Sequence, residues 1–106
     1  MALAEKKCEA CFSAKHPLTR AQFEDMLAEL QDWTVVDDHH LRKTVKTKNF
    51  KQALELANKI GLLAEEEGHH PDLLVRWGEL RIELWTHKVD GLSEADFVLA
   101  AKIDRI

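Results

Sequence analysis

The spacing of apolar residues along the chain changes four times between the repeat of a helix and the repeat of a strand. The predicted elements are, in order, a helix over 20–31, strands over 33–36 and 40–47, a helix over 50–67, strands over 73–77 and 80–85, and a helix that begins at Ser93. Short turns join the strands of each pair, so each pair is an antiparallel hairpin that must bury one face. We therefore predict an α+β fold in which a single four-stranded antiparallel sheet carries three helices packed on one face, in the order α-β-β-α-β-β-α.

Short local signals mark the ends of these elements. Thr19, followed three residues later by Gln22, matches the capping box that begins a helix. Gly68 follows the second predicted helix and suits the left-handed residue that commonly ends one. Residues 37–38 (Asp-Asp) and 78–79 (Gly-Glu) are the predicted turns of the two hairpins.

The length of the chain, 106 residues, corresponds to one domain. Residues 1–17 are polar and have no apolar repeat, so we expect a flexible N-terminal arm followed by one domain over 18–106. A net charge of −4 provides no basic field for nucleic acid. No apolar run reaches the roughly 20 residues of a membrane span, and the N-terminus has no secretory signal pattern. These features favour a cytoplasmic protein.

A Cys-x-x-Cys pair, Cys8 and Cys11, lies in the arm. It could be half of a zinc site or a redox pair. A closed zinc site needs four ligands, and no second pair with suitable spacing follows. A redox motif would sit between a strand and a helix, and nothing apolar precedes this pair. We therefore favour an exposed thiol pair over a zinc site or a redox pair.

The residues at the end of the second predicted helix carry the opposite charge to those that stabilise a helix C-terminus. Residues 65–71 read Glu-Glu-Glu-Gly-His-His-Pro, which places three carboxylates at the negative end of the helix dipole. The carboxylates and the dipole would both favour the charged form of a neighbouring histidine. Such a site could supply a proton near neutral pH. The alternatives are that the glutamates only solvate the helix end and that the His-His pair is structural.

A third histidine, His87, directly follows the fourth predicted strand. If the second hairpin packs beside the second helix, His69, His70 and His87 meet at one end of the sheet. A metal site is disfavoured, because adjacent histidine side chains diverge and seldom bind one ion together. The remaining histidines, which are His16, His39 and His40, are interpreted as surface residues.

A set of spaced residues resembles the signature of the pterin-4a-carbinolamine dehydratase family. These residues are Glu65, His69, His70, Pro71, Trp77, Thr86, His87, Gly91, Leu92, Ser93 and Asp96. The resemblance extends from about residue 17 to the C-terminus. The Cys-x-x-Cys arm is also similar to that of bacterial members.

The resemblance implies an activity and partners. The activity is dehydration of 4a-hydroxytetrahydrobiopterin to quinonoid dihydrobiopterin, without metal or organic cofactor. This step recycles the pterin used by aromatic amino acid hydroxylases, which implies a link to phenylalanine hydroxylase. Members form homodimers or homotetramers. The alternative function is a non-catalytic dimerization or transcriptional coactivator module of the same fold, and the substrate could also be another pterin.

The resemblance implies three catalytic residues. His69 and His87 would flank the C4a–N5 edge of the pterin as acid and base, in either order. His70 would bind or assist from the other side.

The resemblance also implies three substrate-binding residues. Glu65 would hold the pyrimidine part of the pterin or orient a histidine, and Trp77 would help to form an apolar wall. Asp96 belongs to the signature, but its position three residues after Ser93 also suits a helix cap. Trp77 alternates with apolar strand residues, so a core or interface position is also open. Trp85 falls on the opposite strand face from the core and would be exposed or in an oligomer interface.

Overall fold

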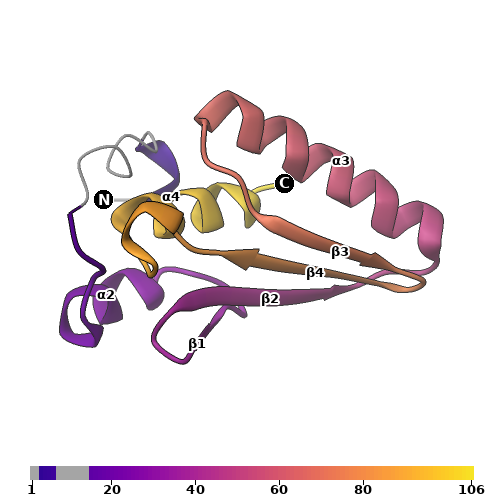
Figure 1. The fold of residues 1–106 in the computed structure, drawn as a ribbon. Helices are drawn as coiled ribbons and strands as arrows, with labels where there is room; N and C mark the ends of the chain where they lie inside the picture. Colours follow the sequence, from indigo (N-terminus) through magenta and orange to yellow (C-terminus); the bar gives the residue numbers. More distant parts are fainter. Residues whose placement is uncertain (1–2, 7–14) are drawn as a thin grey trace.

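The computed structural model describes residues 3–6 and 15–106, and its elements follow the predicted order (Figure 1). The elements are η1 (Leu3–Glu5), α2 (Arg20–Leu27), β1 (Thr34–Val36), β2 (His40–Lys46), α3 (Phe50–Glu67), β3 (Asp72–Arg76), β4 (Glu79–Leu84), η2 (His87–Val89) and α4 (Glu94–Ile103). The predicted fold is confirmed: three α-helices accompany a single four-stranded antiparallel sheet. In the described part of the chain, no helix is both long and apolar enough to cross a membrane.

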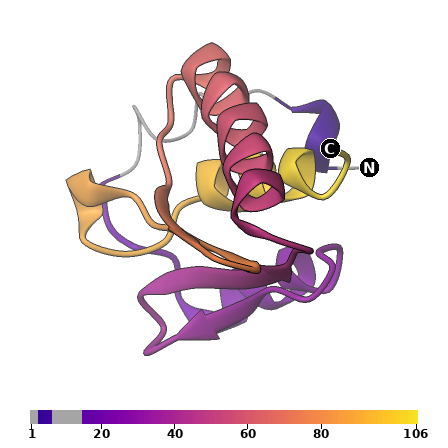
Figure 2. The same cartoon turned by 90° about the vertical axis from the view of Figure 1, so that its right-hand side faces the viewer.

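The sheet has the strand order β1-β2-β4-β3, and every neighbouring pair is antiparallel. Strand β4 lies inside the sheet, and its alternate residues Leu80, Ile82 and Leu84 are fully buried. Leu41 pairs with Leu84 and extends this apolar face into β2. Figure 2 shows α3 and α4 on the same side of the sheet, over this face. The core therefore lies between the sheet and its helices.

Helix α2 joins the same core through an aromatic contact. Phe23 of α2 stacks on Phe97 of α4 with ring centroids 5.8 Å apart. The capping box predicted at Thr19 and Gln22 is present. The helix ends at Leu27, four residues before the predicted end, because the following segment turns toward the C-terminus of α4.

Helix α4 is buried on almost every side, because part of the N-terminal arm covers it. Leu3 and Ala4 of η1 pack against α4 and are buried. Lys6 Nζ lies 3.2 Å from Glu94 Oε1, which ties the arm to the start of the helix. The arm was predicted to be flexible over 1–17, but its residues 3–6 dock on the domain.

The two hairpin turns are only partly as predicted. Asp37 and Asp38 form the first turn with left-handed backbones, φ 53° and 52°. The second turn is Trp77–Gly78 rather than Gly78–Glu79. Glu79 pairs with Arg76 in the sheet, and Gly78 takes the positive φ of 76° that the turn needs.

Candidate active site

A cavity of about 320 Å³ lies at the end of the sheet where α3 and β4 both end. Its lining residues are Gly68, His69, His70, Trp85, Thr86, His87 and Lys88. Two separate segments form it: the residues that follow α3 and the residues that follow β4. His69, His70 and His87 therefore meet at one cavity, as the sequence predicted.

The way in which α3 ends explains why His69 and His70 lie at this cavity. Gly68 ends the helix with a left-handed backbone, φ 67°, as predicted. The chain leaves the helix axis at this residue and enters β3 at Asp72. His69 and His70 occupy the short link and reach the cavity from the helix end.

His69 is held by a buried carboxylate. Its side chain is 9% exposed, Asp96 is fully buried, and Nε2 of His69 lies 2.6 Å from Oδ1 of Asp96. Oδ2 of Asp96 accepts hydrogen bonds from the Ser93 amide at 2.9 Å and from Thr86 Oγ1 at 2.8 Å. A carboxylate that accepts every bond places the proton of the contact on Nε2 of His69. Nδ1 of His69 is then the ring nitrogen left for the cavity.

Asp96 is not on the surface of the cavity. It is fully buried and does not line the cavity, so a direct contact with substrate stays a prediction. The helix-cap alternative agrees with its contact to the Ser93 amide at the first turn of α4. Charge-assisted hydrogen bonds and the positive end of the helix dipole stabilise a carboxylate in this buried position. Asp96 therefore orients His69 from behind.

His70 pairs with Glu65. Nε2 of His70 is hydrogen-bonded to Oε2 of Glu65, one turn back in α3, and both side chains are mostly exposed. Glu65 does not line the cavity and instead borders a groove between α3 and β3. The resemblance implied that Glu65 holds the pyrimidine part of the pterin or orients a histidine, and this contact agrees with the second role.

His87 begins η2 and stacks on Trp85, with ring centroids 4.6 Å apart and planes 18° apart. The loop that carries His87 is closed by a bridge between Thr86 and Gly91, whose carbonyl accepts from the Thr86 amide at 2.7 Å. A side chain at Gly91 would place Cβ 2.6 Å from Cβ of Pro17. The glycine therefore lets the end of the arm pack against this loop.

Trp77 is not at the cavity. It lies in the turn between β3 and β4, at the opposite end of β3 from His70, and is 75% exposed. In the single chain Trp77 lies neither at the cavity nor in the core, so its wall role and the interface alternative stay predictions. Trp85 is the tryptophan that lines the cavity. Its position directly before Thr86 and His87 was the sequence signal for this role.

Metal binding finds no support in the described part of the chain. Among residues 3–6 and 15–106, no group of three or more His, Cys, Asp or Glu side chains is placed to hold a metal ion. Cys8 and Cys11 lie outside the described residues, so the hypotheses for this pair stay predictions.

Comparison with known proteins assigns the chain to a family. The sequence profile described as Pterin 4 alpha carbinolamine dehydratase matches residues 16–106. A relative from Alkaliphilus metalliredigens, named for pterin-4-alpha-carbinolamine dehydratase, is 53% identical over 104 residues, 97% of this chain and 94% of the relative. A relative of the same name from Rubrobacter xylanophilus is 48% identical and covers 98% of this chain and 97% of its own length.

A solved structure has the same fold. The structure titled transcriptional coactivator/pterin dehydratase from Brucella melitensis superposes with a TM-score of 0.77 at 27% identity. The match covers 85% of this chain and 97% of the Brucella chain. From the profile match and the extent of these similarities, the chain belongs to the pterin 4 alpha carbinolamine dehydratase family.

Proposed function

We propose that this protein is a hydro-lyase that dehydrates 4a-hydroxytetrahydrobiopterin to quinonoid dihydrobiopterin. The family is one of dehydratases, and relatives about 50% identical carry its name. The observation that supports the proposal most is the hydrogen bond between His69 and the buried Asp96, at a cavity that His70 and His87 also line.

The reaction requires two proton transfers at neighbouring atoms. The C4a–O bond breaks, and the departing hydroxyl takes a proton and leaves as water. N5 loses its proton, and the electron pair of that N–H bond forms the C4a–N5 double bond. Hydroxide is a poor leaving group, so a positioned acid and base each accelerate the step, by about 10²–10⁴-fold.

The proposed roles follow the placement of the histidines. His69 and His87 enter the cavity from different segments and can flank the C4a–N5 edge, one as the acid and one as the base. Asp96 fixes the ring of His69 so that Nδ1 is available to the substrate. His70, oriented by Glu65, assists from the rim.

The size and lining of the cavity suit a bicyclic pterin. Its volume of about 320 Å³ lies at the lower end of the range for small-molecule sites, about 300–1,000 Å³. Trp85 lies among the lining residues, while the histidines and Thr86 supply polar contacts. A pterin that carries another side chain, such as a folate-related or molybdopterin-related compound, presents the same ring to these residues.

Stopped-flow dehydration of enzymatically generated 4a-carbinolamine tests the proposal. We expect turnover by the full chain, equal with and without a chelator. His69→Ala and His87→Ala should each lower kcat by roughly 10²–10⁴-fold without unfolding the protein, while His16→Ala, at an exposed histidine, should not. Full turnover in both site variants would remove the histidines from the mechanism.

The cellular setting is part of the proposal. A pterin dehydratase would serve a cytoplasmic aromatic amino acid hydroxylase, of which phenylalanine hydroxylase is the expected one. The Brucella structure carries both names, transcriptional coactivator and pterin dehydratase. We favour catalysis for this chain because all three histidines are retained around the cavity, and a binding module would not need them.

We also propose that the chain forms a homodimer or a homotetramer. Large apolar side chains are exposed along α3 and on the β3–β4 hairpin, and two of them, Leu54 and Leu62, border one groove. These side chains are Phe50, Leu54, Leu62, Leu74 and Trp77. An exposed apolar groove of this kind marks an interaction site more often than a free surface.

A further inference from the structure

The ring of His87 belongs to a cluster of four aromatic rings. Trp85 stacks on His87, and the rings of His39 and His40 lie 5.5 and 5.8 Å from Trp85, centroid to centroid. We call His39, His40, Trp85 and His87 the aromatic cluster. It connects the turn between β1 and β2 with the first residue of η2.

The register of the sheet accounts for this cluster. Leu41 of β2 pairs with Leu84 of β4, so the next step of the antiparallel ladder sets His40 opposite Trp85. Leu41 and Leu84 both point into the core. Because successive side chains alternate between sheet faces, His40 and Trp85 meet on the face away from the helices.

A hydrogen bond joins the same turn to the end of η2. Nε2 of His39 lies 2.8 Å from Oδ1 of Asp90, the residue that ends η2 with a left-handed backbone, φ 48°. The segment that carries His87 is thus restrained at its start by Trp85 and at its end by His39. The carboxylate of Asp90 is 90% exposed, so this bond alone contributes little and the ring contacts supply most of the restraint.

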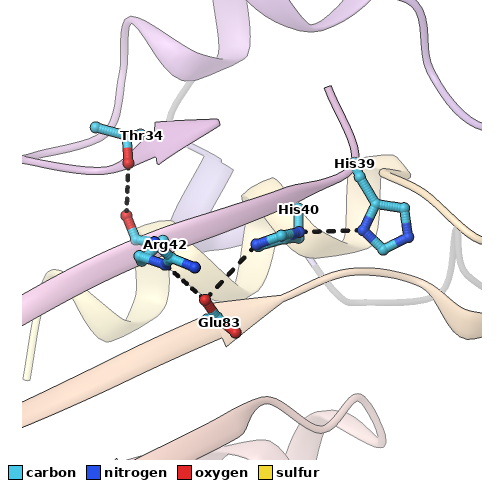
Figure 3. Close-up of polar contacts among 5 residues, drawn as sticks. All are labelled: Thr34, His39, His40, Arg42 and Glu83. Atoms are coloured by element: carbon cyan, nitrogen blue, oxygen red, sulfur yellow. Dashed lines mark hydrogen bonds and ion pairs between the residues drawn. The ribbon is translucent and has the colours of Figure 1, made fainter. Parts of the chain in front are cut away.

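The two histidine rings contact each other and reach toward a third residue. The Nδ1 atoms of His39 and His40 are 3.1 Å apart, and Nε2 of His40 lies 3.6 Å from Oε2 of Glu83, beyond hydrogen-bond distance (Figure 3). Glu83 is itself fixed by Arg42, at 2.5 Å.

We propose that Trp85, His39 and His40 are positioning residues that hold the ring of His87 toward the cavity. The inference rests on the proposed function for the role of His87. The ring of His87 covers one face of Trp85, so that face is not available to stack on a pterin. Trp85 therefore acts through His87, beside which it lines the cavity.

Dehydration kinetics of full-length variants test this proposal. Trp85→Ala should lower kcat by about 10- to 100-fold and change KM by less, because a misplaced reacting group slows the chemical step. Trp85→Phe should recover most of the loss, because a phenyl ring still stacks on imidazole. His39→Ala should lower kcat by up to about fivefold, and the exposed His16→Ala serves as its control.

Three kinetic results would overturn the proposal. One is a raised KM with unchanged kcat in Trp85→Ala, which would make Trp85 a substrate-binding wall. Another is Trp85→Phe no more active than Trp85→Ala. The third is an equal loss in His39→Ala and His16→Ala. Thermal unfolding of each variant identifies any loss that comes from misfolding.

A spectroscopic measurement separates this inference from the proposed function. In the wild-type protein, nuclear Overhauser contacts should join the indole of Trp85 to the ring of His87. In Trp85→Ala, side-chain relaxation should show a more mobile His87 ring, while His69 stays ordered by Asp96. Absence of dehydration in the wild type would defeat the proposed function alone. An equally ordered His87 in Trp85→Ala would defeat the positioning role.

Discussion

The carboxylate of Asp96 makes hydrogen bonds with three neighbours. One oxygen bonds His69, and the other accepts from the first turn of α4 and from Thr86. The Oγ atoms of Thr86 and Ser93 lie 2.6 Å apart, so the hydroxyl groups behind the carboxylate are also satisfied. Burial of an ionised group is tolerated here because each of its contacts is a hydrogen-bond donor.

Asp96→Asn tests this double role. The amide keeps the size of the side chain but loses the charge, and its NH₂ group cannot accept a hydrogen bond. We expect kcat to fall at least about 10-fold, because the one amide oxygen cannot serve both His69 and the donors at Ser93 and Thr86, and the charge that orients His69 is gone. The free energy of unfolding should fall by about 1–3 kcal/mol. Glu94→Gln, in the same turn but more exposed, should change that free energy by less than about 0.5 kcal/mol, and equal effects of the two changes would contradict the role.

Gly91 allows the arm and the His87 loop to pack closely. A methyl group there would lie 2.6 Å from Cβ of Pro17, so Gly91→Ala should lower the free energy of unfolding by about 1–3 kcal/mol. The cost should fall in a Pro17→Gly background, where that Cβ is absent. Urea unfolding of the double-mutant cycle measures the coupling, and additive effects would show that the close approach is not the cause.

At the scale of elements, Glu79 joins the second hairpin to β2. The hydrogen bond from Lys46, with the nearby charges of Lys46, Arg76 and Arg81, lowers the pKa of the Glu79 carboxyl, and partial desolvation opposes this shift. A lowered pKa in the folded state contributes stability that is complete above the unfolded-state value of about 4.3. That contribution is lost as the pH falls through the folded-state value.

Glu79→Gln should therefore be less stable than the wild type at pH 7, and the difference should shrink toward pH 3. Protonated glutamic acid and glutamine resemble each other, which is why the two proteins converge. Urea unfolding across this range measures the effect, with Glu55→Gln as a control on the exposed side of α3. A difference that stays constant with pH would show that Glu79 stabilises by packing alone.

The sequence predicted the ends of elements where neighbouring residues determine them. It missed the ends that residues far along the chain determine. Helix α3 runs over the predicted 50–67, because Asn49 caps it and Gly68 ends it. The end of α2 was wrong because Asp104, far along the chain, accepts from the Gln31 amide and from Nε1 of Trp33. These bonds turn the chain after α2, and no local pattern encodes them.

For the candidate site, too, the sequence predicted what the order of the elements determines and missed contacts between distant residues. The meeting of His69, His70 and His87 followed from element order, because the end of α3 and the end of β4 are fixed by the hairpin between them. Trp77 follows the far end of β3, a full strand away from His70, and its wall role came from the resemblance and not from the order of the elements. His39 was interpreted as a surface residue because its contact with Asp90 crosses 51 residues of sequence.

At the scale of the whole molecule, self-association is a separate prediction. Leu62, on α3, is 70% exposed beside the apolar groove. Light scattering at micromolar concentration should give a mass at least twice the 12.2 kDa of the chain. Leu62→Lys should shift the protein toward the monomer, because a buried charge opposes association. A 12.2 kDa particle in the wild type would contradict the prediction.

The most direct test of the account is a crystal structure with a dihydropterin bound. We predict that the pterin ring occupies the cavity, with its C4a–N5 edge between His69 and His87 and within hydrogen-bond distance of both rings. Asp96 should remain bonded to His69 behind the ligand. A pterin bound in the groove of α3, or one that contacts neither His69 nor His87, would contradict the account.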